Sequence, residues 1–269
     1  AEQTSLVSRK AIELWQEAGM PVDLVQLVLG TGALQGNALV SHPDVNAVIF
    51  TGSTATAKRI ETALAQNAAP ETLFVAETGG LNAMIADASA LPEQVVKSVM
   101  ASAFQSAGQR CSALRMLYVQ REIYPQILEM IAGAMALLKV GDPGELKCDV
   151  GPVIDAAAAQ ALNTYINKQQ SRIVYQTPTE GLDGHFVTPT LLEVDGINDL
   201  DFERFGPILH IAPYDVDQLD SVVADINARG YGLTFAVHSR IQSRTEQLCS
   251  HLNVGNNYMT RNQIGDMVA

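Results

Sequence analysis

The residues best suited to covalent chemistry lie in the segment SAGQRCSALR, which spans residues 106–115 and contains Cys111. A cysteine thiolate is a strong nucleophile, and Cys111 stands between a cation, Arg110, and a hydroxyl group, Ser112. A lone cysteine is more often a small apolar residue buried in a core. Taken alone, this segment therefore leaves Cys111 open between a nucleophile and a packing residue, and packing is the commoner case.

Glu77 is the second candidate, because it follows an apolar run and precedes two glycines in the segment FVAETGG (74–80). A carboxylate at the carboxyl end of a buried strand lies where open α/β sheets bind their ligands. In that place it acts either as a general base or as a cap for the turn. On local grounds the capping role is favoured.

Two further segments combine glycine with polar residues. The segment IFTGSTATAKRI (49–60) reads as a strand, a Gly52–Ser53 turn and the start of a helix, where backbone N–H groups favour an anion. It lacks GxGxxG spacing and a P-loop lysine, so an ordinary strand–helix turn explains it as well. The segment ERFGPILH (203–210) is by itself an ordinary loop before a strand.

The elements that must position these residues alternate along the chain. Apolar segments predict strands at 24–30, 45–53, 72–80, 115–120, 172–176, 185–194, 206–215, 233–239 and 254–260. Apolar residues at helical spacing predict helices at 6–15, 54–66, 93–104, 124–141, 156–170, 217–229 and 241–252. Such alternation is typical of an α/β protein with mostly parallel sheets, and the glycines at 79–80 favour a domain boundary there.

Composition narrows the function classes. The 269 residues suffice for one large or two modest domains, and the net charge of −12 argues against a nucleic-acid partner. No apolar run approaches the roughly 20 residues that span a bilayer. Three widely spaced cysteines fit a reducing compartment, and the histidines show no metal-ligand spacing. The opening AEQT and the apolar last residues lead us to expect a fragment of a longer polypeptide.

The order of the motifs carries more information than any one of them. FTGST is followed by ETGG, then by GQRC, with Cys111 34 positions after Glu77, and then by FGP. This order resembles the aldehyde dehydrogenase superfamily, and the agreement extends from AEQT through DVGPVID to VGNNY. Three longer segments resemble the glutamate-semialdehyde (L-Δ1-pyrroline-5-carboxylate) dehydrogenase half of the bacterial bifunctional proline utilisation A family. They are AETGGLNAMIADASALPEQVV, SAGQRCSALR and RNQIG.

The resemblance implies an aldehyde dehydrogenase-like α/β fold in two parts. Residues 1–78 would be the C-terminal part of a Rossmann-type NAD-binding domain, and residues 79–269 the cysteine-bearing catalytic domain with a mostly parallel sheet. The implied activity is NAD-dependent oxidation of L-glutamate γ-semialdehyde to L-glutamate, the second step of proline catabolism. A proline dehydrogenase domain with FAD would lie elsewhere in the same polypeptide, and we expect a cytoplasmic homo-oligomer.

The resemblance also implies roles for single residues. Cys111 matches the nucleophile, whose backbone N–H helps to hold the oxyanion, and Glu77 matches the base that activates water. Residues matched to cofactor binding are Gly52 and Ser53 near the diphosphate and nicotinamide, Glu203 with Phe205 at the nicotinamide ribose, and Glu2 at the adenosine ribose. The carboxylate of Glu2 would disfavour a 2′-phosphate and so favours NAD over NADP.

Substrate selectivity is implied for a third set. Arg110, Ser112 and Gly265 match positions that hold the substrate carboxylate, and Phe104 would supply an apolar wall. Asp266 stands where a small residue is expected and would repel a carboxylate, which keeps another semialdehyde open as the substrate. A non-catalytic aldehyde dehydrogenase-like domain is disfavoured, because Cys111, Glu77 and Glu203 are all present.

Overall fold

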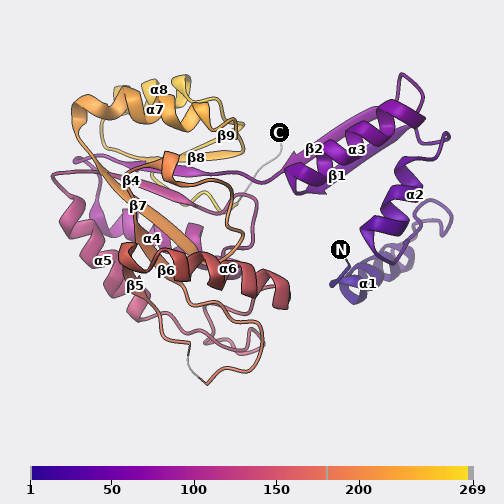
Figure 1. The fold of residues 1–269 in the computed structure, drawn as a ribbon, viewed down its shortest axis with the longest axis horizontal. Coiled ribbons are helices and arrows are strands. Elements are labelled where there is room, and N and C mark those ends of the chain that lie inside the picture. Colours follow the sequence, from indigo (N-terminus) through magenta and orange to yellow (C-terminus); the bar gives the residue numbers. More distant parts are fainter. Residues whose placement is uncertain (1, 180, 266–269) are drawn as a thin grey trace. The chain divides into compact units, whose positions relative to one another are not determined.

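The chain forms two compact units in this computed structural model, which describes residues 2–179 and 181–265. The first unit is Ala1–Thr78 and the second is Gly79–Ala269. The division lies between Thr78 and Gly79, at the double glycine. Figure 1 labels helices and strands of both units.

The first unit contains a parallel pair of strands joined by a helix. Strand β1 (Ala47–Gly52) pairs with β2 (Leu73–Thr78), and α3 (Thr54–Asn67) crosses from one to the other. Thr51 lies opposite Glu77 and Gly52 opposite Thr78, so both predicted motifs end at the same edge. The elements before β1 are α1 (Ser5–Glu17), a π-helical turn (Gly32–Gly36) and α2 (Asn37–Val40).

The strand predicted at 24–30 is wrong. Residues 25–29 have no regular secondary structure, and Leu24, Val28 and Leu29 are 71%, 53% and 49% exposed. A strand needs a neighbour that completes its ladder of backbone hydrogen bonds. No described strand pairs with this segment, so its apolar composition alone does not produce a strand.

The second unit is built on a seven-stranded sheet with the order β5-β6-β7-β4-β3-β8-β9. All neighbouring strands are parallel except β5 and β6, which confirms the predicted mostly parallel α/β architecture. The strands are β3 (Ala83–Ala86), β4 (Met116–Gln120), β5 (Ile173–Gln176), β6 (Thr190–Glu193), β7 (Ile208–Tyr214), β8 (Thr234–His238) and β9 (Asn256–Met259). The helices are α4 (Pro92–Phe104), α5 (Tyr124–Ala136), α6 (Ala156–Lys168), α7 (Leu219–Ala228) and α8 (Gln242–His251), with short 3-10 turns between.

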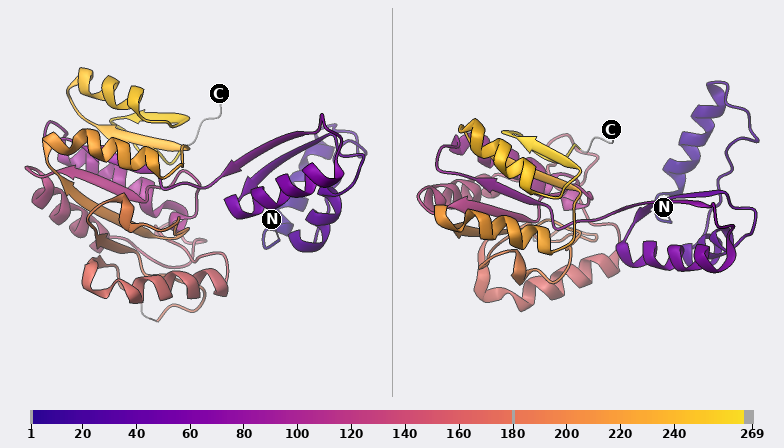
Figure 2. Two further views of the ribbon diagram at one scale, coloured as in Figure 1. Left: turned by 45° about the horizontal axis from the view of Figure 1, so that its top comes forward. Right: turned by 90° about the horizontal axis from the view of Figure 1, so that it is seen from above.

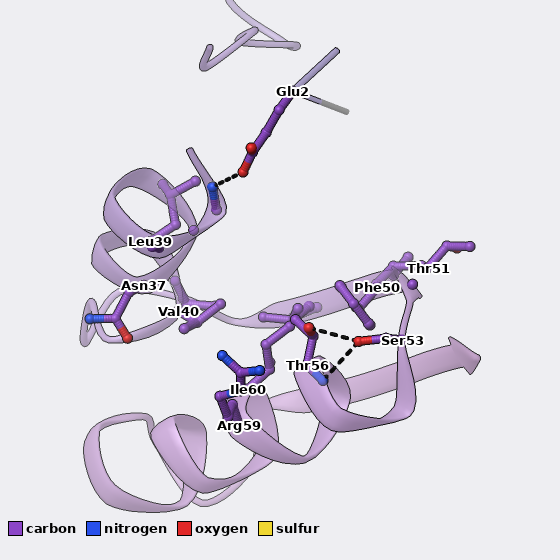
Figure 3. Close-up of a pocket in the computed structure, with 18 residues that line it drawn as sticks. Glu2, Asn37, Leu39, Val40, Phe50, Thr51, Ser53, Thr56, Arg59 and Ile60 are labelled. Atoms are coloured by element: carbon purple, nitrogen blue, oxygen red, sulfur yellow. Dashed lines mark hydrogen bonds between the residues drawn. The ribbon is translucent and has the colours of Figure 1, made fainter. Parts of the chain in front are cut away.

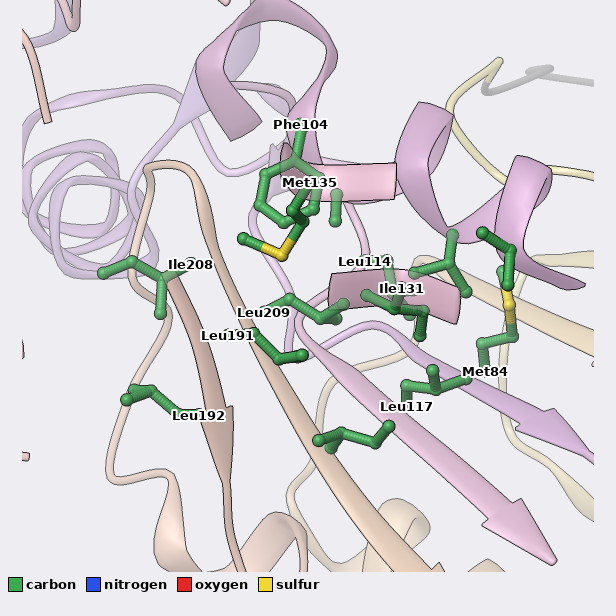
Figure 4. Packing of buried hydrophobic residues seen from close by; sticks show 14 of the residues in the cluster. Met84, Phe104, Leu114, Leu117, Ile131, Met135, Leu191, Leu192, Ile208 and Leu209 are labelled. Atoms are coloured by element: carbon green, nitrogen blue, oxygen red, sulfur yellow. The ribbon is translucent and has the colours of Figure 1, made fainter. Parts of the chain in front are cut away.

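Helices cover both faces of this sheet, and alternate side chains of each strand enter two separate cores (Figure 2). In β4, Leu117 (Figure 4) and Val119 pack with α4, α5 and α6, whereas Met116 and Tyr118 pack with α7 and α8. This alternation follows from the two-residue period of a strand. Because both faces are buried, the strands read as continuous apolar runs, as the sequence analysis expected for parallel sheets.

The direction of the strands places the chemistry. Strands β3, β4 and β7 are adjacent and parallel, so the segments that precede them meet at one edge of the sheet. These segments are 79–82, 105–115 and 201–207. They contain the ETGG glycines, Cys111 and the FGP loop, which are the predicted motifs of this unit.

Candidate active site

Cys111 lies in a tight loop between α4 and β4. The helix ends at Phe104, and Ser106, Ala107 and Gly108 then take left-handed backbone conformations, with φ of 54°, 52° and 65°. Two successive non-glycine residues in this region are uncommon and cost about 1 kcal/mol or more each. Neighbouring contacts must therefore hold the loop in this form.

The carbonyl groups around Cys111 are held by Asn82, which precedes β3. Its side-chain Nδ2 donates to the carbonyl oxygens of Cys111 (2.6 Å) and Ala113 (3.0 Å), and its Oδ1 accepts from the backbone N–H of Thr234 (3.2 Å). Asn82 is buried, so these hydrogen bonds do not compete with water. They fix the backbone on which the half-buried Cys111 stands.

Gln109 fixes the other side of the same loop. Its Nε2 donates to the carbonyl oxygens of Ser106 (3.2 Å) and Pro152 (3.3 Å), and its Oε1 accepts from the N–H of Ile154 (2.8 Å). A single amide side chain thus ties the loop to the segment that leads into α6.

The residues predicted to hold a substrate carboxylate differ in their surroundings. Arg110 is exposed, and its Nε donates to the hydroxyl of Ser106 at 3.1 Å. Ser112 is buried, and its hydroxyl donates to the carbonyl oxygen of Ile264 at 2.9 Å. Gly265 accepts a hydrogen bond from the Tyr258 hydroxyl through its carbonyl oxygen. Ser112 therefore links the cysteine loop to the segment that contains Gly265.

Two other predictions for the substrate site have different outcomes. Phe104 is 1% exposed and packs in the core beneath α4, among the side chains shown in Figure 4. Its ring contributes to the core here, and its part in a substrate wall stays a prediction. Asp266 lies outside the described residues.

Glu203 is linked to the cysteine loop by Arg115, which the sequence analysis treated only as part of the strand at 115–120. Arg115 Nη2 lies 2.9 Å from Glu203 Oε1, and the arginine is 1% exposed. The guanidinium also lies 5.4 Å from the centre of the Phe205 ring. Burial lowers the pKa of Arg115 and raises the pKa of Glu203, and the attraction between the two charges opposes both shifts.

The other predicted cofactor residues line a cavity of about 1000 Å³ in the first unit (Figure 3). Glu2, Gly52 and Ser53 all contribute to its wall. The carboxylate of Glu2 accepts a hydrogen bond from the N–H of Gly32, and the Ser53 hydroxyl accepts one from the N–H of Thr56. The cavity thus combines acceptors for hydroxyl groups with the N-terminus of α3, which favours an anion.

Glu77 lies in β2 at the same edge as Gly52, and it is exposed. Glu2, Gly52, Ser53 and Glu77 are thus described in the first unit, and Cys111 and Glu203 in the second.

Residues 2–179 and 181–265 contain no group of three His, Cys, Asp or Glu side chains that could hold a metal ion. Within the same residues, no helix has the length and apolar character needed to cross a membrane.

Several residues of the site were not predicted. Asn82, Gln109 and Arg115 brace the cysteine loop, and Arg59 lines the cavity of the first unit. A signal was present for Arg115 and Asn82, because each is a polar residue at the start of an otherwise apolar strand. Gln109 and Arg59 carry no local signal, since their partners and cavity depend on distant segments.

Comparison with known proteins covers the whole chain. The aldehyde dehydrogenase family model matches residues 1–269. The bifunctional protein PutA of Klebsiella aerogenes is 45% identical over 100% of this chain and 21% of its own length. The chain therefore spans about a fifth of that curated relative.

Two solved structures are similar in sequence and in fold. A Bradyrhizobium japonicum proline utilization A variant superimposes with a TM-score of 0.95 at 47% identity, covering all of this chain and 28% of that one. The 1-pyrroline-5-carboxylate dehydrogenase from Thermus, solved with bound NAD, gives a TM-score of 0.90 at 31% identity, covering all of this chain and 53% of that one. Together with the family match, these similarities show that the chain belongs to the aldehyde dehydrogenase family.

Proposed function

We propose that this chain carries the nucleophile and part of the cofactor site of an NAD-dependent dehydrogenase that oxidises L-glutamate γ-semialdehyde to L-glutamate. The observation that carries the proposal is the braced loop around Cys111, which holds a half-buried thiol beside the buried Arg115 and its partner Glu203. The similarity to PutA and to 1-pyrroline-5-carboxylate dehydrogenases supports the substrate class. It also supports a place in proline catabolism.

Cys111 acts as the nucleophile in this proposal. Its thiolate attacks the aldehyde carbon, so that a carbon–sulfur bond forms and the carbonyl oxygen becomes an oxyanion. The backbone N–H of Cys111 stabilises that oxyanion. The carbon then loses a hydride while its oxygen re-forms a double bond, which leaves a thioester on Cys111. NAD⁺, when bound, accepts this hydride.

Glu77 completes the reaction by removing a proton from water. The resulting hydroxide attacks the thioester carbon, the carbon–sulfur bond breaks, and the acid leaves with Cys111 restored as a thiolate. Hydrolysis of this kind yields a carboxylic acid. Transfer to another acceptor would not need a carboxylate base.

The proposal assigns cofactor-binding roles to residues of each unit. In the first unit, Glu2 accepts hydrogen bonds from the adenosine ribose, and Gly52 and Ser53 face the diphosphate at the α3 terminus. In the second, Glu203 accepts from the nicotinamide ribose beside Phe205. The acceptors and the helix N-terminus of the first-unit cavity support binding of the adenosine and diphosphate parts of a dinucleotide there.

The substrate carboxylate is held by Arg110, Ser112 and Gly265 in the proposal. The exposed guanidinium of Arg110 supplies the charge. Ser112 acts by holding the segment that contains Gly265, since its hydroxyl donates to the carbonyl oxygen of Ile264.

We further propose that the chain works within a longer cytoplasmic polypeptide that also contains an FAD-dependent proline dehydrogenase domain, and that this polypeptide forms a homo-oligomer. The support is the match to PutA, which covers the whole of this chain but only about a fifth of the length of that relative. The net charge of −12 disfavours nucleic acid as a partner of this segment.

The test is formation of NADH by the full-length polypeptide that contains this chain. Glutamate semialdehyde, succinate semialdehyde and propanal are compared, and we expect the first to give a kcat/KM at least about tenfold above propanal. Cys111→Ala should lower turnover by at least about a thousandfold. Glu77→Gln should form the thioester, seen by mass spectrometry, and hydrolyse it slowly. Equal rates with propanal would contradict the carboxylate assignment, and an active Cys111→Ala variant would contradict the mechanism.

A further inference from the structure

Arg115 has an unusual set of contacts for a residue at the start of a central strand. Its Nη1 donates to the carbonyl oxygens of Gly108 (2.7 Å) and Gly206 (3.2 Å), and its Nη2 to that of Arg110 (3.1 Å). Its Nε and Nη2 both donate to Glu203 Oε1, at 3.3 and 2.9 Å. A guanidinium has five N–H groups, and these five contacts use all of them.

The acceptors come from motifs that are far apart in the sequence. Gly108 and Arg110 belong to the loop before Cys111, and Glu203 and Gly206 belong to the loop before β7. The two loops also touch directly, since a Cβ placed on Gly108 would collide with the carbonyl oxygen of Gly206. One buried side chain thus sets the distance between the thiol loop and the Glu203 loop.

The contact reaches a third motif through Glu203. Its Oε2 lies so close to Gly79 that a Cβ there would collide with it, and the backbone of Gly80 forms a hydrogen bond with the same carboxylate. The absence of side chains in the double glycine therefore has a local reason. The carboxylate is held by the guanidinium on one side and by this backbone on the other.

We propose that Arg115 is a positioning residue for the oxidation, which fixes the peptide units before Cys111 and orients the Glu203 carboxylate through the same guanidinium. It acts through these groups and does not contact the reacting atoms. The inference rests on the proposed roles of Cys111 and Glu203. It assigns a cause for their relative placement within the second unit, which neither motif explains alone.

The charge of Arg115 adds an electrostatic effect to this geometry. The guanidinium and the Cys111 thiolate attract each other, and a nearby cation favours a thiolate over a thiol. Lysine would supply a similar charge but not the planar fork that binds several acceptors at once. The two contributions can therefore be separated by substitution.

A purely structural role is the alternative, and the molecule offers a matched control. Arg244 Nη1 lies 2.9 Å from Oδ2 of Asp87, a carboxylate that is 1% exposed, so this is another arginine–carboxylate pair of the same unit. Asp87 follows β3, whereas Arg115 precedes the adjacent parallel strand β4. The two pairs therefore lie at opposite edges of one sheet.

The test compares Arg115→Met, Arg115→Lys and Arg244→Met in the full-length polypeptide. The first measurement is the pH dependence of Cys111 alkylation by iodoacetamide, followed by mass spectrometry of the Cys111 peptide. We expect Arg115→Met to slow alkylation at neutral pH about tenfold and to move its midpoint to higher pH. Arg115→Lys should restore the midpoint, and Arg244→Met should leave it unchanged while lowering the melting temperature.

The second measurement is the steady-state rate with NAD⁺ and the aldehyde. Both Arg115 variants should lower kcat on the order of 100-fold, because the lysine lacks the fork that holds the loops, and both should raise KM for NAD⁺. A kcat and KM for Arg115→Lys equal to those of wild type would overturn the proposal. This outcome decides the matter even if Arg115→Met fails to fold. The proposal would also be overturned if the pH dependence of Cys111 alkylation were the same in Arg115→Met as in Arg244→Met.

The two proposals fail in different ways. If the wild-type polypeptide oxidised none of the aldehydes, the proposed function would fail. The alkylation arm would still report whether Arg115 governs Cys111, because it needs neither substrate nor cofactor.

Discussion

His210 shows how one buried residue supports the site without contact to Cys111. It lies in β7, and its Nδ1 is 2.9 Å from the carbonyl oxygen of Arg115, while its Nε2 is 2.8 Å from the Tyr165 hydroxyl. The neutral ring satisfies both partners by donating from Nδ1 and accepting at Nε2. His210 therefore holds the backbone of the residue whose side chain holds the two loops.

The protonation of His210 predicts a loss of stability in acid. Burial lowers its pKa to about 4 from 6.5. Between these two values the unfolded chain binds a proton that the folded chain does not, so the free energy of unfolding falls as the pH drops from about 6.5 to about 4. For this residue the full loss is roughly 3 kcal/mol.

His210→Asn tests this sign. We expect the variant to be less stable at neutral pH but to have a shallower dependence of melting temperature on pH below 6.5. His238, whose pKa burial also lowers to about 4, contributes a slope of the same sign in both proteins. An unchanged slope in His210→Asn would show that other groups govern the acid transition.

At the scale of elements, the turn between α4 and β4 contains a glycine that any side chain would strain. Gly108 has φ of 65° and packs on Gly206. Gly133, in the middle of α5, has open space where a side chain would go. Of these two positions, only Gly108 is therefore restricted to glycine by its backbone conformation and its contacts.

Replacing each glycine by alanine separates the two cases. Gly108→Ala should lower the free energy of unfolding by about 2–4 kcal/mol and reduce activity, because it strains the backbone and displaces the FGP loop. Gly133→Ala should raise stability by about 0.5–1 kcal/mol, since alanine favours a helix. Urea denaturation of both variants measures the difference, and equal effects would contradict the assigned loop geometry.

The same elements show what the sequence could predict. Periodicity located β4, α3 and α4 to within a residue or two, because each is a regular apolar pattern with clear ends. It missed β3, which has four residues and a fully apolar pattern without a period. It also predicted a helix to residue 141 that ends at Ala136.

The candidate site was predictable only in part. Motif order singled out Cys111 and Glu203 as candidates, and the structure describes their contacts within the second unit, while their roles stay predictions. The role of Arg115 depends on a partner 88 residues away, and no local pattern records such a distance. Ser106 and Ala107 adopt left-handed conformations that tertiary contacts impose against their intrinsic preference.

At the scale of the whole molecule, the two units differ in how fully they bury their strands. Every residue of β4 is buried, whereas Ile49 in β1 and Leu73 in β2 are 79% and 58% exposed. Local opening of a strand is easier where few apolar contacts hold it. The central sheet and the two-stranded pair should therefore open independently.

Hydrogen exchange on the 269-residue chain tests this difference. We expect backbone amides of β1 and β2 to exchange at least about tenfold faster than those of β4 and β3. Strand β9, which is an outermost strand of the seven-stranded sheet, serves as an internal reference for a strand with a neighbour on one side only. Equal protection of β1 and β4 would mean that the two units open as one.

The opposite edges of the seven-stranded sheet also matter for protein engineering. The edge that precedes β3, β4 and β7 carries the thiol loop, whereas the other edge carries the pair formed by Asp87 and Arg244, to which Ser239 adds a hydrogen bond. Mutations confined to that second edge should change the melting temperature while leaving kcat unchanged. Stability and catalysis can therefore be engineered at separate edges of the same sheet.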